Sequence, residues 1–376
     1  MKILIAPDKF KGSLTADEVA EAMAEGIRAV SQEIESIQIP LADGGDGTAA
    51  ILTKHLHGEF IPVKVHNPLF EIIEASYGYS ESGRTAFIEM SAASGLRLIP
   101  AEKQNPLNTS TLGTGEMIMD AIRHGAEKII LGIGGSATND AGIGMAAVLG
   151  FRFLDHDGNE LKPVGANLEF IQSIDDSTLH YNLAGVDVQV ACDVDNPLTG
   201  KRGAAWVYGP QKGATTKTII KLDKGLKNFA RVIKEKYRKD ISRLPGAGAA
   251  GGLGAGAMVF LNARLRSGVE LVMDITRFED HLKNADLIIT GEGKIDDQSF
   301  QGKVLSGITK LAKKYNLPVI AVCGDLKLDI RKLKNHGINE AISLVDYFGS
   351  VEQAMHSTRT GITEVTKILL KKYTTR

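Results

Sequence analysis

A glycine-rich stretch at residues 132–144, GIGGSATNDAGIG, has the composition of a phosphate-binding loop. It follows the apolar run Lys128–Leu131, which predicts a buried strand. Its glycines let backbone amides approach a ligand closely, and a helix predicted over 141–149 would point its amide-rich start into the loop. A tight turn between strand and helix would also favour Gly, Ser and Asn, so both interpretations stay open. The candidate phosphate-binding residues are Gly134, Gly135, Ser136, Thr138, Asn139 and Asp140.

Two lysines and a hydroxyl follow the first predicted strand, residues 2–6. Their loop, DKFKGS, precedes a helix whose start is marked by the capping box Thr15–Glu18. Because the lysine charges and the helix dipole agree in sign, the loop suits a small carboxylate or a phosphate. Solvated lysines on a surface turn are the alternative. The candidate substrate-binding residues here are Asp8, Lys9, Lys11 and Ser13.

Carboxylates recur after other predicted strands. Asp43 and Asp46 follow the strand predicted at 37–41, where they could hold Mg²⁺ or bind substrate hydroxyls. The alternative role is capping of the next helix, which Asp46 or Thr48 could provide. Asp193 follows the strand predicted at 186–192, a position suited to removing a proton from an alcohol or holding Mg²⁺. A predicted exit loop at 291–297 combines acids, a lysine and glycines, the parts that phosphoryl transfer requires. Its charged residues are Glu292, Lys294, Asp296 and Asp297.

Other chemistries fit the sequence less well. The GxxxxGK[ST] phosphate loop is absent, and the one GxGxxG match, at 246–251, follows a polar segment ending in Pro245 rather than a strand. A flexible loop or a helix packed closely on its neighbour is the better interpretation of that run. The nine histidines avoid the glycine-rich loops, which disfavours nucleophilic hydrolysis. Magnesium-dependent phosphoryl transfer is the chemistry that remains.

Composition narrows the class of protein. A chain of 376 residues predicts two or three domains, and a net charge of −1 favours neither nucleic acid nor an anionic membrane. Its two cysteines, Cys192 and Cys323, lie far apart, which predicts a reducing compartment and no structural zinc. The apolar start is too short for a signal peptide, and no run approaches the roughly 20 apolar residues that cross a bilayer. We therefore expect a cytoplasmic protein.

Strands and helices alternate at both ends of the chain, whereas the middle mixes hairpins and helices. The pattern predicts an α/β fold with two domains: residues 1–68 plus 286–376, and an inserted mixed α/β domain at 69–285. In the middle, strands are predicted at 72–79 and 85–90 and a long helix at 218–236. In the last third, strands are predicted at 286–290 and 318–323 and helices at 303–315 and 361–372.

Five blocks of the sequence together resemble the type-1 glycerate kinase family. In chain order they are APDKFKGS (6–13), PLADGGDG (40–47), GGSATNDAG (134–142), ACDVDNPL (191–198) and TGEGKID (290–296). The resemblance implies transfer of phosphate from ATP to D-glycerate with Mg²⁺, giving 2-phosphoglycerate. It also implies a discontinuous flavodoxin-like parallel-sheet domain, an inserted domain likened to restriction-enzyme folds, and an active site in the cleft between them.

Roles for the candidate residues follow as hypotheses. Gly134, Gly135, Ser136 and Asn139 would hold ATP phosphates, and Lys9 and Lys11 would face the glycerate carboxylate or the transferred phosphoryl group. Asp193 is the preferred base or metal ligand, with Asp296 as its rival and Lys294 beside it. Asp43, Asp46 and Asp140 would bind substrate hydroxyls or Mg²⁺.

Alternatives to the 2-phosphate product stay open. The same kinase could give 3-phosphoglycerate. An oxidoreductase acting on a small hydroxy acid, or a non-catalytic ligand-binding protein, fits the sequence less well. The expected partners are the small molecules glycerate and ATP, with no nucleic acid and no membrane. A homodimer is compatible with the sequence, which does not establish the oligomeric state.

Overall fold

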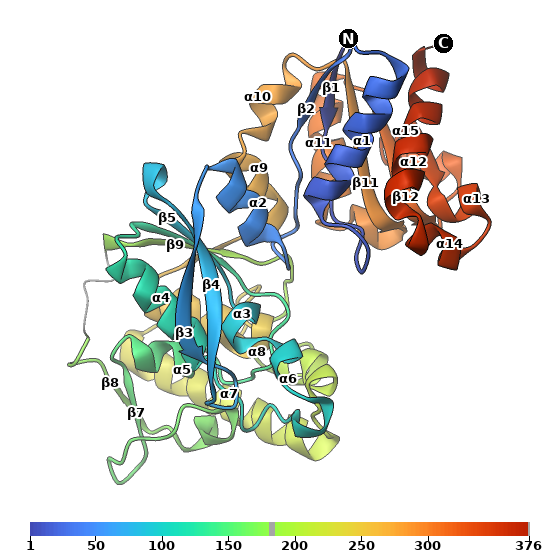
Figure 1. Ribbon diagram of the computed structural model, residues 1–376. Coiled ribbons are helices and arrows are strands. Elements are labelled where there is room, and N and C mark those ends of the chain that lie inside the picture. The colour runs from blue at the N-terminus through green and yellow to red at the C-terminus, as the bar shows by residue number, and fades with distance from the viewer. Residues whose placement is uncertain (180–184, 375–376) are drawn as a thin grey trace. The chain divides into compact units, whose positions relative to one another are not determined.

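The computed structural model describes residues 1–179 and 185–374, which separate into two compact units. Unit 1 comprises residues 1–43 and 269–376, and unit 2 comprises residues 44–268. Each unit is built on its own β-sheet with helices around it, so the predicted α/β class is confirmed (Figure 1). The predicted domain division, at 68/69 and 285/286, stays a prediction.

Unit 1 is built on a five-stranded, fully parallel sheet. In spatial order its strands are β13 (Glu340–Ser343), β12 (Val319–Leu326), β11 (Leu287–Ile295), β1 (Lys2–Ile5) and β2 (Glu35–Gln38). Most of these strands are apolar and buried, as expected for a parallel sheet covered on both faces.

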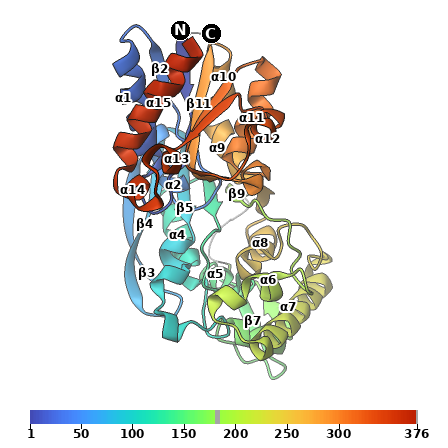
Figure 2. The ribbon, with the colours of Figure 1, turned by 90° about the vertical axis from the view of Figure 1, so that its right-hand side faces the viewer.

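The helices of unit 1 cover both faces of this sheet. Helices α1 (Ala16–Val30) and α15 (Thr358–Thr374) lie side by side, one at each end of the chain (Figures 1 and 2). The predicted capping box is confirmed, since Thr15 and Glu18 bond reciprocally at the start of α1. The remaining helices are α9 (Gly268–Ile275), α10 (Phe278–Leu282), α11 (Val304–Tyr315), α12 (Ile330–Asn335), α13 (Leu344–Phe348) and α14 (Val351–His356).

Unit 2 is built on a six-stranded mixed sheet. In spatial order its strands are β10 (Arg264–Arg266), β9 (Asp187–Ala191), β6 (Lys128–Gly132), β5 (Thr85–Glu89), β4 (Ile72–Ser80) and β3 (Glu59–His66). The first four strands run parallel, β4 pairs antiparallel with β5, and β3 pairs antiparallel with β4. A separate hairpin pairs β7 (Arg152–Leu154) with β8 (Ser173–Asp175).

One core cluster of buried apolar side chains joins the sheet of unit 2 to its helices. These helices are α3 (Ser91–Ser94), α4 (Leu112–Arg123), α5 (Ile143–Val148), α6 (Ala204–Tyr208), α7 (Thr216–Tyr237) and α8 (Ala249–Phe260). Unit 2 also contains helix α2 (Thr48–His55), whose residues are not part of this cluster. Short 3₁₀ turns lie at Glu81–Gly83, Leu96–Leu98, Ala101–Lys103, Gly165–Phe170 and Pro210–Lys212, and in unit 1 at Asp297–Phe300.

Several elements differ from the sequence-based expectation. For example, the strand predicted at 37–41 is β2, Glu35–Gln38, and strands β8, β10 and β13 were not predicted. Strand β3 was not predicted, because its residues alternate between exposed and half-buried and include Pro62. The helix predicted at 141–149 is only six residues long, Ile143–Val148. Strand β11 was predicted to end at Thr290 but continues to Ile295, because it pairs with β12 along that length.

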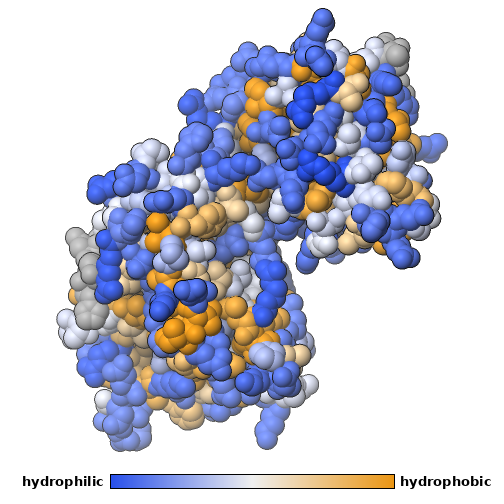
Figure 3. Space-filling view, viewed as in Figure 1, coloured by the Kyte–Doolittle hydropathy of each residue, from blue (hydrophilic) through white to orange (hydrophobic). Residues whose placement is uncertain are grey.

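Apolar side chains also reach the surface of unit 2. Figure 3 shows them gathered over strands β3 and β4, where Phe60 and Ile72 are exposed. No helix in the described part of the chain has the length and apolarity to span a bilayer.

The close approach of α1 and α15 depends on Gly26. A Cβ atom at this position would lie 2.6 Å from the backbone oxygen of Thr363 and 2.8 Å from Cβ of Thr366. We expect Gly26→Ala to lower the free energy of unfolding of unit 1 by about 1–3 kcal/mol, because the two helices must separate. Urea unfolding followed by circular dichroism measures this change.

The exposed residue Ala29 of the same helix offers the control. Ala29→Gly should cost about 1 kcal/mol through helix propensity alone. If Gly26→Ala instead stabilised the protein by a similar amount, propensity would outweigh packing and the close helix contact would be wrong.

Candidate active site

The order in which the chain adds strands to the sheet of unit 1 reverses between β1 and β11. From β1 the chain moves outward to β2 on one side, and from β11 it moves to β12 and then β13 on the other. In open α/β sheets the loops leaving two such strands diverge, and ligands bind in the crevice at their carboxyl ends. Unit 1 therefore has a candidate ligand site where β1 and β11 end.

Three carboxyl groups come together at this edge of the sheet. Asp8 follows β1, Asp43 follows β2, and Glu292 lies in the extended part of β11. The amide of Asp8 donates to the backbone oxygen of Gly291 at 2.8 Å, which holds Asp8 beside Glu292. Asp8 and Glu292 are 8% and 7% exposed, so two acids are nearly buried at the carboxyl edge.

Burial changes the acidity of both groups. It raises the pKa of Asp8 to about 6, helped by the charge of Asp43 and opposed by the Lys9 amide and the charges of Lys9 and Lys303. Burial likewise raises the pKa of Glu292 to about 7, with Asp8 adding to the rise and a hydrogen bond from Ser299 opposing it. Perturbed carboxyl groups of this kind are typical of functional sites.

Glu292 was not among the site residues that we predicted. It was expected in an exit loop, whereas β11 carries it into the sheet beside β12. The sequence offered one signal, an acid between glycines directly after the apolar run 287–290. That signal did not distinguish a buried strand position from a solvated loop.

The neighbouring charged residues of β11 and its exit are more exposed. Lys294 forms an ion pair with Asp296 at 2.9 Å, and 55% of the Lys294 side chain is exposed. Asp296 also accepts the amide of Gln298 and begins a 3₁₀ turn. The hydrogen bond from Lys294 lowers the pKa of Asp296, so this carboxylate stays ionised at neutral pH.

The lysine loop of unit 1 lies at the same edge of the sheet. Lys9 is half-buried and Lys11 is exposed. The hydroxyl of Ser13 donates to Oγ1 of Thr358 at 2.6 Å. Lys11 and Ser13 border a small cavity of about 110 Å³, lined mainly by apolar side chains and by Gly293.

In unit 2 the glycine-rich loop leaves β6 as predicted. Gly134 and Gly135 are exposed, and Gly135 has a φ of +70° that favours glycine. Ser136 is nearly buried, and Thr138 and Asn139 are fully buried. Only the first part of the loop is therefore open to a ligand.

Asp140 occupies the place that was expected for an anion. Its carboxylate accepts from the amide and hydroxyl of Thr111, both at 2.8 Å, and from the amides of Gly142 and Gly144, both at 3.2 Å. Burial raises its pKa, and these hydrogen bonds oppose the rise. Asp140 thus organises the start of α5, and a phosphate would use the amides around Gly134 and Gly135 instead.

Lys212 forms hydrogen bonds to the buried side of this glycine-rich loop. This role was not predicted from the sequence. Nζ of Lys212 donates to Oγ of Ser136 at 2.7 Å and to the backbone oxygen of Thr138 at 2.6 Å. The side chain is 1% exposed, and burial lowers its pKa to about 7 against the opposing charge of Asp140. The local sequence QKG does not distinguish this buried lysine from a solvent-exposed one.

Two buried side chains of the loop have polar atoms with no hydrogen-bond partner among the described residues. They are Thr138 at Oγ1 and Asn139 at both amide atoms. Unsatisfied polar atoms in a protein interior are costly and call for a bound water or a functional reason. Together with Lys212, the side chains of Thr138 and Asn139 form the buried polar part of the glycine-rich loop.

The GxGxxG run supports the same loop from another side. Gly251, with a φ of +69°, lies so close that a Cβ would be 2.0 Å from the backbone oxygen of Thr138. Gly256 of α8 approaches the oxygen of Ala141 in the same way, at 2.4 Å. The run is therefore closely packed, as predicted, but it is not a regular helix: Gly246, Ala250 and Gly251 have positive φ, and the regular part of α8 begins only after them.

Asp46 and Asp193 are the remaining predicted carboxylates of unit 2. Asp46 pairs with Arg97 at 2.6 Å. Neither Asp46 nor Thr48 caps α2 as we had considered, because Glu89 accepts the amides of Gly47 and Ala49 there. Asp193 is exposed and accepts the amide of Gly268 at 2.9 Å.

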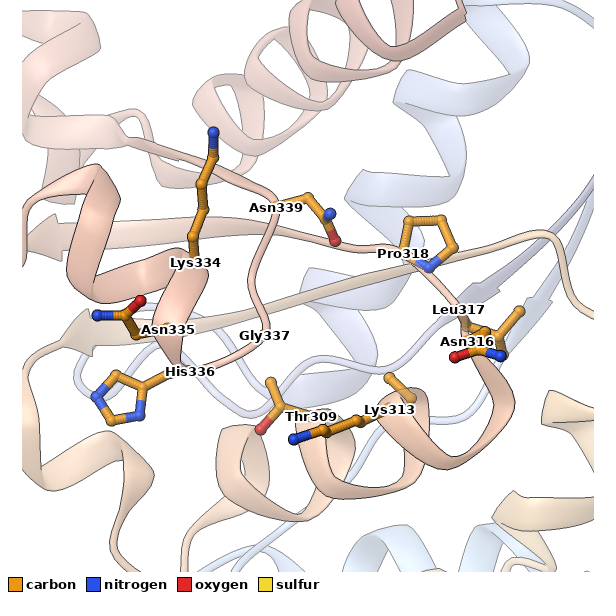
Figure 4. Close-up of a pocket in the computed structure, with 11 residues that line it drawn as sticks. Thr309, Lys313, Asn316, Leu317, Pro318, Lys334, Asn335, His336, Gly337 and Asn339 are labelled. Carbon is orange, nitrogen blue, oxygen red and sulfur yellow. The ribbon is translucent and has the colours of Figure 1, made fainter.

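Figure 4 shows a larger hollow elsewhere in unit 1, of about 420 Å³. It is lined by the end of α11 and by the turn between α12 and β13, including His336. Pro318, at the start of β12, also lines it, so the hollow lies at the amino edge of the parallel sheet. That is the edge opposite Asp8 and Glu292.

The buried charge of Glu292 should cost stability at alkaline pH. In the unfolded chain this group ionises near pH 4.5 and in the folded protein near pH 7, so stability falls as pH rises through that interval. Glu292→Gln removes the charge. We expect it to raise the melting temperature at pH 8 by a few degrees, from about 1–3 kcal/mol, and to change it little at pH 5.

Differential scanning calorimetry at the two pH values measures the effect. Glu279→Gln is the matched control, since the Glu279 side chain, in the same unit, is 43% exposed and its pKa is lowered by a hydrogen bond from Lys314. It should show no gain at pH 8. An equal effect of Glu292→Gln at pH 5 and pH 8 would contradict a charge-based cost.

Comparison with known proteins places the chain in a family. The model of the glycerate kinase family matches residues 3–374. A glycerate kinase of Halalkalibacterium halodurans is 50% identical over 353 residues, 94% of this chain and 93% of that protein. The glycerate 2-kinase of Escherichia coli K12 is 47% identical over 354 residues, with the same coverage.

A solved structure agrees with these matches. The crystal structure of a candidate glycerate kinase 2 from Salmonella typhimurium LT2 superposes with a TM-score of 0.88 at 44% identity, and the match covers 100% of this chain and 99% of that one. The chain therefore belongs to the glycerate kinase family and is an enzyme of the kinase class.

Proposed function

We propose that the protein transfers the γ-phosphoryl group of ATP to the 2-hydroxyl of D-glycerate, giving ADP and 2-phosphoglycerate, with Mg²⁺. The observation that carries this proposal is membership of the glycerate kinase family, and the likeness to the E. coli protein named glycerate 2-kinase supports the position of the phosphate. With ATP as co-substrate, we expect the protein to act in the cytoplasm.

The glycine-rich loop of unit 2 is the proposed site for the ATP phosphates. Gly134 and Gly135 are exposed and lack side chains, so their backbone can approach phosphate oxygens closely. Ser136 adds a hydroxyl that Lys212 orients. Thr138, Asn139 and Asp140 are fully buried beneath the loop and would support it rather than touch the nucleotide.

The carboxyl edge of unit 1 is the proposed site for glycerate. The ammonium groups of Lys9 and Lys11 suit its carboxylate, and the carboxyl groups of Asp8 and Asp43 can accept hydrogen bonds from its hydroxyls. Ser13 would contribute a further hydroxyl. Asp46, which pairs with Arg97 in unit 2, remains a substrate-binding candidate.

The candidate magnesium ligands are Asp193 and Asp296, with Lys294 next to Asp296 as a cation for the transferred group. Within the described residues, the one cluster of three acid or histidine ligand atoms within 4.8 Å is Asp155, His156 and Asp157, outside the proposed sites. Single carboxylates nevertheless fit Mg²⁺, which keeps several waters and is commonly held by one or two carboxylates together with substrate phosphates. Bound there, Mg²⁺ would neutralise phosphate charge.

Phosphorus NMR of the purified protein with ATP, Mg²⁺ and D-glycerate tests the proposal. We expect a new phosphomonoester signal split by one proton, because C2 of glycerate carries a single hydrogen. Chelating the Mg²⁺ with EDTA should abolish the signal. A signal split by two protons would indicate 3-phosphoglycerate, and unchanged ATP would contradict kinase activity on glycerate.

The role of Lys212 gives a second prediction. Lys212→Met keeps the length of the side chain but removes the donors to Ser136 and Thr138. We expect the KM for ATP to rise on the order of tenfold or more, because the loop loses both hydrogen bonds from Nζ of Lys212. The KM for glycerate should change less. Steady-state kinetics with each substrate varied in turn measures the difference.

Lys217→Met is the matched control, since Lys217 is an exposed lysine on α7 of the same unit. It should leave both KM values unchanged. Equal increases in both KM values for Lys212→Met, together with a lower melting temperature, would show a general loss of structure and contradict a specific role in ATP binding.

A further inference from the structure

We propose that Glu292 is the general base of the reaction: its carboxylate takes the proton of the glycerate 2-hydroxyl as that oxygen attacks the γ-phosphorus. This inference rests on the proposed function and goes beyond it by naming the proton acceptor. The sequence alone favoured Asp193 for this role, with Asp296 as its rival.

Glu292 lies at the carboxyl edge of the sheet of unit 1, where a substrate is expected to bind. It lies in the part of β11 that extends past Thr290, beside the loop that follows β1. This is the point where the strand order of unit 1 reverses and where open α/β sheets bind their ligands. Lys9 and Lys303, both half-buried, supply positive charge at the same edge.

The hydrogen bonding of Glu292 involves only part of its carboxylate. Its side chain bonds to Ser299, but Oε1 is buried and has no partner among the described residues. A buried carboxylate oxygen without a donor is unfavourable in a folded protein. A substrate hydroxyl is a donor of the kind that this oxygen lacks, and the acidic cluster of unit 1 thus contains an acceptor prepared for one.

The charged groups around Glu292 explain how it can exchange a proton near neutral pH. Negative charge comes from Asp8 after β1 and from Asp296 in the exit loop, and positive charge comes from Lys303 before α11. The buried thiol of Cys323 faces it from β12. Burial is the largest influence, and it raises the pKa of Glu292 to about 7. A base works best when its pKa lies near the working pH.

The other acids of this cluster, Asp296 and Asp8, already form ion pairs or hydrogen bonds. Asp296 pairs with Lys294 and caps a 3₁₀ turn, and its lowered pKa makes it a weak base. Asp8 accepts the amide of Lys9 at 2.7 Å and titrates lower than Glu292, near 6. Glu292 is therefore the strongest base of this cluster that also has an unsatisfied oxygen.

The glycerate O–H bond breaks, and its proton passes to Glu292 as the oxygen forms a bond to the γ-phosphorus of ATP. The bond from that phosphorus to the β,γ-bridging oxygen breaks, and ADP leaves with its electron pair. Glu292 then releases the proton to solvent, so that one proton is produced for each phosphoglycerate.

The pH dependence of kcat/KM for glycerate tests this role in wild type and in Glu292→Gln. The wild-type value should fall tenfold per pH unit below about pH 7, as the base becomes protonated. Glu292→Gln should lower kcat by about 10²-fold or more, and its residual activity should lose that acidic limb. Glu279→Gln, the control outside the carboxyl edge, should keep the wild-type rate and profile.

Several results would overturn the role. Near-normal turnover of Glu292→Gln would do so, as would slow turnover with the wild-type acidic limb, which would show that Glu292 only positions other groups. If Glu292→Gln does not fold, Glu292→Asp replaces it: a displaced limb supports the base and an unchanged limb contradicts it. A wild-type protein that makes no phosphoglycerate contradicts the proposed function itself, which separates the two failures.

A second variant addresses the neighbour. Asp8→Asn removes a negative charge that raises the pKa of Glu292, so the acidic limb of kcat/KM should move to lower pH. If the limb disappeared in Asp8→Asn but remained in Glu292→Gln, Asp8 would be the base and the assignment to Glu292 would be wrong.

Discussion

The parallel pairing of β1 with β11 is the contact on which the site of unit 1 depends. It joins Ile3 to Leu287 and is reinforced by the hydroxyl of Thr290, which donates to the backbone oxygen of Ala6 at 2.8 Å. All of unit 2 lies between these strands in the sequence. Because β11 docks against β1 from the side opposite β2, the strand order reverses there and the two exit loops diverge.

The same pairing explains the unusual chemistry of that edge. A carboxyl group in an exposed loop would be solvated, whereas Glu292 lies in the extension of β11, beside β12 and the loop that carries Asp8, and is nearly buried. The fold thus keeps acids where their charge is unfavourable, at a cost to stability. Such a compromise is typical of active sites, where local rules are broken for function.

Unit 2 shows a complementary arrangement in its glycine-rich loop. There the buried charge is Lys212, and the loop is fixed by hydrogen bonds from that lysine, by the carboxylate of Asp140 and by close contacts with the glycines of α8. These groups fix the loop from beneath and leave Gly134 and Gly135 exposed. A loop held this way can present its backbone to a ligand without first being ordered, which lowers the cost of binding.

The sequence by itself determined the α/β class, most strands and most of the longer helices, the capping box at Thr15 and the family, because apolar periodicity, turn residues and long motifs are local properties. It also indicated which loops carry chemistry. Tertiary structure decided which charged residues are buried: Glu292 and Lys212 look like solvated residues in the sequence, and Asp140 like a ligand. The physical reason is that burial, and the pKa change it causes, depends on strands and helices that are distant in the chain and meet only in the fold.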